Sequence, residues 1–174
     1  MAGNTTMNVN ENELVIKRIF DAPRELVFKA WTEPEHLNHW WAPQGFTMNS
    51  SKLDLVPDGV FHYSQRTPDG QVMWGKFVYR EIVVPEKLVF INSFSDEEGN
   101  TTRAPFSPTW PLEILNILTL SEHHGKTTLL IQGGPLSASE EESKTFEAAR
   151  EGVQQGFAET FDRLAHHLAK NWLC

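Results

Sequence analysis

The chain has 174 residues, 40% of them hydrophobic, with six tryptophans and a formal net charge of −8. That composition is typical of one globular domain and excludes the basic surface that nucleic-acid binding requires. The single cysteine, Cys174, excludes an intramolecular disulfide and a cysteine-based zinc site. Residues 1–12 lack the apolar core of a signal peptide, and no apolar run approaches the roughly 20 residues of a membrane span. We therefore expect a cytoplasmic protein with a flexible N-terminal arm over 1–12.

The chain is expected to begin with a strand over 13–20, followed by two short helices. Pro23 and Pro34 each suit the first turn of a helix, where a missing N–H costs nothing. Asp21 and Thr32 are the expected N-caps. The second helix ends on a pair of tryptophans at positions 40 and 41.

Alternating apolar and polar residues, separated by turn sequences such as Pro-Asp-Gly, predict a series of strands. We expect these strands over residues 46–56, 61–66, 72–82, 85–94, 112–120 and 127–132. Most of the connections between them are short enough to be hairpins. The sequence therefore predicts an antiparallel sheet.

A single long helix is predicted from Ser139 to about Lys170. Ser139 and Glu142 have the spacing of a capping box, and apolar residues then recur every three or four positions up to Leu168. Gly152 and Gly156 lie next to this apolar face, although a glycine inside a helix costs about 1 kcal/mol relative to alanine. Either a close approach of helix and sheet or an open space between them would explain the two glycines.

The run from Phe20 to Trp41, the downstream Pro-Asp-Gly turns and the long closing helix together resemble the SRPBCC (START-like) superfamily. They are most similar to the bacterial branch related to the activator of heat-shock-protein-90 ATPase, in its C-terminal domain. The tract from Phe106 to Glu113 looks like a signature of a sub-branch. The resemblance covers one domain, about residues 13–170, leaving 171–174 as a C-terminal tail.

The resemblance implies an α+β helix-grip fold. In this fold a curved antiparallel sheet of about six to seven strands wraps around a long C-terminal helix, with two short helices after the first strand. A strongly curved sheet cannot pack flush along a straight helix, so a gap is left between them. In the resembled family this gap is an apolar pocket for lipids, hormones or other small molecules.

Large apolar side chains are the main candidates for lining such a pocket, because ligand sites are mostly apolar and aromatic. The alternative for each ring is a place in the packed core. One tryptophan of the 40–41 pair is expected to edge the pocket mouth. The candidate ligand-binding residues of this kind are Phe28, Trp31, Trp40, Trp41, Phe46, Phe61, Trp74, Phe77, Phe94, Trp110, Val153, Phe157 and Phe161.

Polar anchors for a ligand are fewer. Glu113 is the first candidate, because large apolar residues surround it in sequence, and a buried carboxylate must be paired or protonated. Arg103 is its expected partner, or else a partner for an acidic ligand. Asn116 is expected to project into the cavity, and His62 and Tyr79 are further options.

No catalytic residue, cofactor or metal is assigned. His36 and His39 have the spacing of metal ligands on a helix, but they lack further ligands and are expected to be surface residues. The chain has neither a nucleophile elbow nor a phosphate-binding loop.

The first functional hypothesis is a non-enzymatic protein that binds a small hydrophobic, aromatic or lipid-like molecule. The resemblance implies two alternatives. One is a co-chaperone-like protein acting on a heat-shock-protein-90-type ATPase, and the other is a cyclase or hydrolase using the same pocket. A chaperone and a second copy of the chain are left open as partners.

Overall fold

The computed structural model describes residues 13–172 and the side chains of residues 13–170. The expected flexible arm over 1–12 lies outside the described residues. None of the helices in the described part of the chain is both long and apolar enough to cross a membrane.

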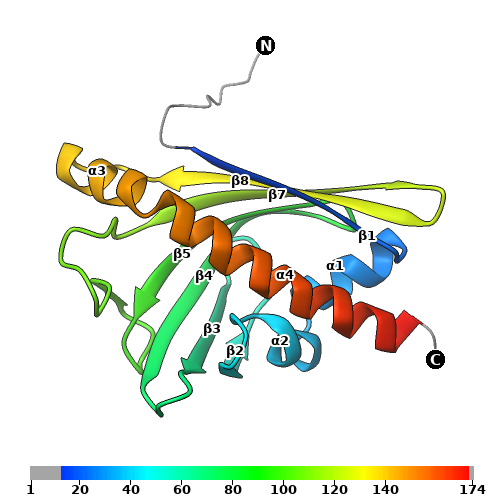
Figure 1. Ribbon diagram of the computed structural model, residues 1–174, viewed down its shortest axis with the longest axis horizontal. Helices are drawn as coiled ribbons and strands as arrows, with labels where there is room; N and C mark the ends of the chain where they lie inside the picture. The colour runs from blue at the N-terminus through cyan, green and yellow to red at the C-terminus, as the bar shows by residue number, and fades with distance from the viewer. Residues whose placement is uncertain (1–12, 173–174) are drawn as a thin grey trace.

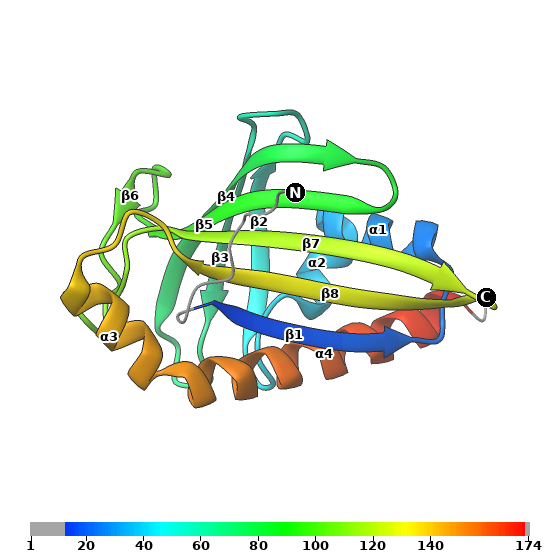
Figure 2. The ribbon, with the colours of Figure 1, turned by 90° about the horizontal axis from the view of Figure 1, so that it is seen from above.

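The backbone forms one antiparallel sheet, in the order β1-β8-β7-β5-β4-β3-β2, with the short β6 paired to β5. Consecutive strands are mostly neighbours. Strand β1 pairs with β8 and forms one edge of the sheet, and β2 forms the other edge. Figure 2 shows the sheet from above, with β1 at its edge beside α4. The strands are β1 (Leu14–Phe20), β2 (Thr47–Leu53), β3 (Val60–Arg66), β4 (Val72–Val83), β5 (Lys87–Ser95), β6 (Thr101–Thr102), β7 (Ile114–His123) and β8 (Lys126–Pro135).

The two short helices predicted after the first strand are present as α1 (Arg24–Thr32) and α2 (Pro34–Trp40). Their expected N-caps are wrong. Pro23 and Glu33 occupy the cap positions without a side-chain hydrogen bond. The Thr32 hydroxyl instead donates to the Phe28 carbonyl, 2.8 Å away, because Thr32 still belongs to the first helix.

The closing helix lies across one face of the curved sheet, as Figure 1 shows, so the helix-grip fold is confirmed. It is not one helix, however. It breaks at Ala149 into α3 (Glu140–Ala148) and α4 (Arg150–Trp172), so the second helix runs two residues past the expected end. The predicted capping box on Ser139 is present.

The break lies at Ala149, whose φ of −93° and ψ of 3° are outside the helical range. The Ala149 N–H donates to the carbonyls of both Thr145 and Phe146, which tightens the last turn of α3. On either side of the break the chain packs against different partners. Phe146 contacts Trp110 at 5.5 Å between ring centroids, whereas Phe161 contacts Trp31 at 6.2 Å. The helix therefore bends where its packing changes.

The hydrophobic core lies between the sheet, the C-terminal half of α4 and the two short helices. Aromatic rings fill most of it. Most of these rings meet edge to face or tilted at 4.9 to 6.4 Å, and Phe77 stacks on Phe90 at 4.2 Å. The largest side chains of this core with almost no exposed surface are Phe20, Trp31, Trp40, Phe61, Phe77, Tyr79, Phe90 and Phe161.

Candidate functional site

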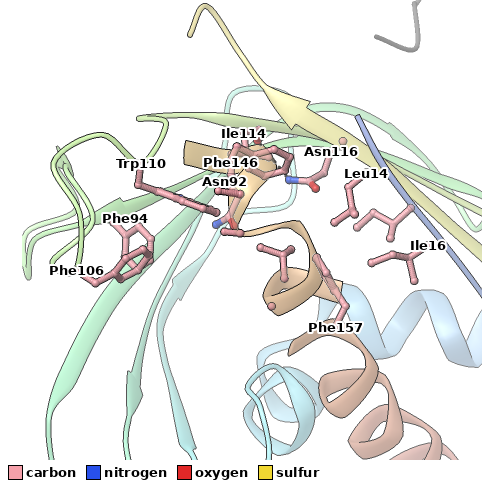
Figure 3. Close-up of a pocket in the computed structure, with 16 residues that line it drawn as sticks. Leu14, Ile16, Asn92, Phe94, Phe106, Trp110, Ile114, Asn116, Phe146 and Phe157 are labelled. Atoms are coloured by element: carbon pink, nitrogen blue, oxygen red, sulfur yellow. Dashed lines mark hydrogen bonds between the residues drawn. The ribbon is translucent and has the colours of Figure 1, made fainter. Parts of the chain in front are cut away.

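A cavity of about 530 Å³ lies under the break between α3 and α4, where the helix pair and the sheet diverge. Strands β1, β5, β7 and β8 form one wall, and the loop between β6 and β7 borders one end (Figure 3). The lining residues are Leu14, Ile16, Asn92, Phe94, Phe106, Trp110, Ile114, Asn116, Ile131, Gly133, Phe146, Ala148, Ala149, Gly152, Val153 and Phe157.

The helical wall of this cavity is made of small residues at its centre, including Ala149 and Gly152. A Cβ atom added to Gly152 or Gly156 would meet no atom within 4 Å. Of the two explanations for these glycines, the structure supports an open space rather than close packing. The sequence of α4 thus leaves volume next to the cavity that larger side chains would reduce.

An aromatic row forms one end of the cavity. Phe106 lies between Phe94 and Trp110, at 5.5 and 5.7 Å between ring centroids, and Trp110 in turn contacts Phe146 at 5.5 Å. Phe106 is 63% exposed although its ring lines the cavity, so it stands at the mouth. Figure 3 shows this row at the end of the cavity away from Leu14 and Ile16.

The loop that carries Phe106 and Trp110 is tied to α3 by side chains. Arg103 donates to the Trp110 carbonyl at 3.2 Å and pairs with Glu142. The hydroxyls of Thr109 and Thr145 are hydrogen-bonded at 2.8 Å. The loop and α3 therefore form one connected wall of the cavity.

The structure corrects the expected pairing of Glu113. Arg103 pairs with Glu142, and within residues 13–172 the half-buried Glu113 side chain makes no ion pair or hydrogen bond. Glu113 precedes β7 and does not line the cavity. The capping box holds Glu142 at the start of α3, where its carboxylate pairs with Arg103.

Five of the fifteen predicted ligand-binding residues line the cavity, namely Phe94, Trp110, Asn116, Val153 and Phe157. Two smaller hollows of about 180 Å³ each adjoin it, because they share lining residues with it. Trp41 borders both hollows, which makes it the member of the tryptophan pair at the edge, while Trp40 is fully buried. Trp74 borders one hollow but stacks on His62 at 5.0 Å, on the face of the sheet away from the helix.

The other predicted aromatic residues belong to the core. They lie where α1, α2 and the C-terminal half of α4 cover the sheet, and most of their rings contact another aromatic ring. These residues are Phe28, Trp31, Trp40, Phe61, Phe77 and Phe161, with Phe46 packed against them at the edge.

Sequence reasoning missed several lining residues. Asn92 borders all three hollows and lies on β5 in phase with Phe90 and Phe94, so strand alternation could have identified it. Phe106 lies in the proline-rich tract already singled out. The aliphatic residues of the sheet wall, such as Ile16 and Ile131, carried no signal that distinguishes a cavity wall from a core.

None of the described residues that line the main cavity is titratable. Tyr63 lies next to this lining, because its hydroxyl accepts from the Asn92 amide at 3.1 Å. Burial raises the pKa of Tyr63, and the side chains of Trp41 and Asn92 act in the opposite direction. The cavity is thus walled by apolar groups and two asparagines.

Of the two histidines expected at the surface of α2, His39 is exposed and His36 is half-buried, and both contact His167 of α4. His36 Nδ1 and His167 Nε2 are 2.8 Å apart, and the His39 ring stacks on His167 at 5.2 Å. In the part of the chain that the structure describes, no group of three or more His, Cys, Asp or Glu side chains is arranged to hold a metal.

The family described as Activator of Hsp90 ATPase homolog 1-like protein matches residues 21–169. The chain belongs to this family. The resemblance inferred from the tryptophan-rich run is therefore confirmed at the level of the family. No curated protein matches the chain.

Solved structures of bacterial proteins share the fold of this chain. A protein from Arthrobacter aurescens has a TM-score of 0.76 at 23% identity, covering 91% of this chain and 86% of its own. A protein from Mycobacterium smegmatis has a TM-score of 0.75 at 22% identity, with coverages of 91% and 92%. The AHSA1 protein from Silicibacter pomeroyi has a TM-score of 0.69 at 18% identity, with coverages of 91% and 99%.

Proposed function

We propose that the protein binds a small apolar molecule in the cavity between the sheet and the α3–α4 helix pair. The observation that carries the proposal is the cavity itself, about 530 Å³ in volume and lined mainly by aliphatic and aromatic side chains. That volume lies within the usual range of roughly 300–1,000 Å³ for small-molecule sites. The exposed Phe106 ring at the mouth gives an arriving ligand an apolar surface to contact first.

Affinity in such a site comes from removing apolar surface from water, at roughly 25 cal/mol per Å². Phe157 and Val153 supply that surface from α4, and Ile16 and Ile131 supply it from the sheet. No acid or base lines the cavity among the described residues, so nothing in its lining supports the enzyme hypothesis. The site is suited to holding a molecule rather than to converting it.

A neutral fluorescent probe, N-phenyl-1-naphthylamine, tests the proposal by titration. Val153 lines both the main cavity and one adjoining hollow, so Val153→Trp fills the site. Ile19→Trp is the matched control, because Ile19 is 59% exposed and lines none of the described hollows. We expect the wild type and the control to bind alike, and Val153→Trp to bind at least tenfold more weakly. Equal binding by all three would contradict the proposal.

The family description supports a second proposal, that the chain acts on a heat-shock-protein-90-type ATPase. A titration of the chain into such an ATPase from a bacterium tests it, with Val153→Trp alongside the wild type. Stimulation that both proteins produce equally would support a co-chaperone role independent of the cavity. An unchanged ATPase rate would count against it.

A further inference from the structure

The cavity has two polar side chains among its sixteen lining residues, and both are asparagines. Asn92 comes from β5 and Asn116 from β7, and Figure 3 shows both carboxamides among the apolar side chains of the lining. No charged side chain lines this cavity within the described chain. Burying a charge without a partner is far more costly than burying a hydrogen-bonded neutral group. The lining therefore disfavours a charged ligand.

The hydrogen bonds of Asn92 fix the orientation of its amide. Its Nδ2 donates to the backbone carbonyl of Lys76 at 3.0 Å and to the Tyr63 hydroxyl at 3.1 Å. A carbonyl only accepts, so the nitrogen must face Lys76. Both amide protons are then used, and the Asn92 Oδ1 accepts no hydrogen bond from the described residues. What Asn92 offers the cavity is an acceptor.

Asn116 offers the same group. It is only 8% exposed, and its Nδ2 donates to the Ile114 carbonyl over a long 3.3 Å, which again fixes the orientation of the amide. Its Oδ1 has no donor among the described residues. Gly133 lies opposite on β8, and a Cβ atom there would stand 2.8 Å from this oxygen. A side chain at position 133 would therefore clash with the Asn116 Oδ1. Two carboxamide oxygens are thus available as acceptors.

The arginines that flank the lining residues in sequence already have carboxylate partners. Arg103, whose loop carries Trp110, pairs with Glu142, and Arg150, next to Ala149, pairs with Glu147 at 2.8 Å. A carboxylate ligand would therefore find both of these cations engaged.

We propose that the ligand is uncharged and donates a hydrogen bond, from a hydroxyl or an N–H group, to the Oδ1 of Asn116 or Asn92. This inference rests on the proposed function and narrows its ligand to neutral apolar alcohols, phenols and amides. The apolar body of the ligand packs against Phe157 and the aromatic row, and its donor group faces the sheet.

Three compounds of nearly the same shape test this at pH 7: 2-naphthol, 2-methoxynaphthalene and 2-naphthoate. Each is titrated against the bound N-phenyl-1-naphthylamine probe. A hydrogen bond to a buried acceptor is worth roughly a factor of ten. We expect naphthol, which is neutral and a donor, to bind at least tenfold more tightly than the methoxy compound, which cannot donate. Naphthoate, which is charged, should bind at least tenfold more weakly than the methoxy compound.

Asn116→Leu removes the acceptor while keeping the size of the side chain, and breaks only the long bond to Ile114. We expect it to reduce the preference for naphthol over methoxynaphthalene to below threefold, with the affinity for methoxynaphthalene little changed. Asn92→Leu is the second variant.

Equal binding of naphthol and methoxynaphthalene by the wild type would overturn the inference while leaving the proposed function intact. A preference for naphthol over methoxynaphthalene that persists in both Asn116→Leu and Asn92→Leu would also overturn the inference. If one variant does not fold, the ligand series on the wild type still decides. Absence of binding by every compound and by the probe would overturn the proposed function, and this inference with it.

Discussion

Gly133 and Asn116 are paired across β8 and β7, and the glycine has no side chain because the Asn116 Oδ1 and the Leu115 carbonyl occupy the space. A Cβ on Gly133 would stand 2.8 Å from the first oxygen and 2.5 Å from the second. Both distances are shorter than real Cβ contacts. The wall of the cavity is thus shaped by a backbone oxygen that cannot move aside and by the asparagine that we propose as an anchor.

Gly133→Ala should therefore destabilise the protein, by about 1–3 kcal/mol, as expected for overpacking. Gly152→Ala is the matched control, because nothing lies within 4 Å of its added methyl group, and it should stabilise α4 by up to about 1 kcal/mol. Urea unfolding of the two variants measures both effects. The same sign for both substitutions would show that the space around these glycines is not as described.

Arg163 joins α4 to the segment that follows Trp41. Its Nη1 donates to the carbonyls of Ala42, Pro43 and Phe46 at 2.9, 2.9 and 3.1 Å. Arg163→Met keeps the apolar stem but removes these three hydrogen bonds, and among the described residues only the Pro43 carbonyl keeps another donor, the Phe46 N–H. We therefore expect a loss of about 2 kcal/mol in unfolding free energy.

Arg80→Met is the control for this prediction, because Arg80 is an exposed residue whose ion pair, with the exposed Asp58 at 3.5 Å, lies at the surface. Substitutions of that kind stay within about 0.5 kcal/mol. If thermal unfolding gives both variants the same loss, the hydrogen bonds of Arg163 to this segment do not stabilise the fold.

The contact of α2 with α4 should weaken in acid. Burial lowers the pKa of His167 to about 4, and the charges of His36, His39 and Lys170 act in the same direction. The unfolded chain binds a proton at this histidine near pH 6.5, whereas the folded chain does not until about pH 4. The stability that the neutral His167 contributes is therefore fully present above pH 6.5 and is lost as the pH drops from 6.5 to 4.

We expect His167 to contribute on the order of 1–2 kcal/mol to this loss, after allowing for solvent screening. His167→Gln should flatten the dependence of the melting temperature between pH 7 and pH 4.5. The neighbouring His166 is exposed, so His166→Gln should leave the dependence unchanged. An equal effect of the two substitutions would contradict the assignment to His167.

Local patterns predicted most of the fold. Strand alternation, turn sequences and the proline positions are properties of short segments, so the hairpins and the two short helices were found. The break at Ala149 was not, because alanine favours a helix and the bend arises from packing on each side of it. The predicted partner of Arg103 was wrong for a similar reason. Arg103 pairs with Glu142 because the loop approaches α3 in the folded chain, and short sequence patterns do not show this approach.

The site was only partly predictable. Alternation along a strand tells which side chains face inward, and it would have separated Trp74 from Phe77 on β4. It does not tell where along the sheet the helix pulls away. Phe90 and Phe94 both point to the helix side of β5, yet Phe90 is core and Phe94 lines the cavity. That difference depends on the curvature of the whole sheet.

The central claim is that a neutral apolar molecule binds between the sheet and the α3–α4 pair. The most direct measurement is an NMR titration of isoleucine methyl groups with 2-naphthol. Ile16, Ile114 and Ile131 line the cavity, whereas Ile19 and Ile117 do not. We expect saturable shifts of the resonances of Ile16, Ile114 and Ile131, with those of Ile19 and Ile117 unchanged. Unchanged resonances for all five, or shifts confined to Ile19 and Ile117, would contradict it.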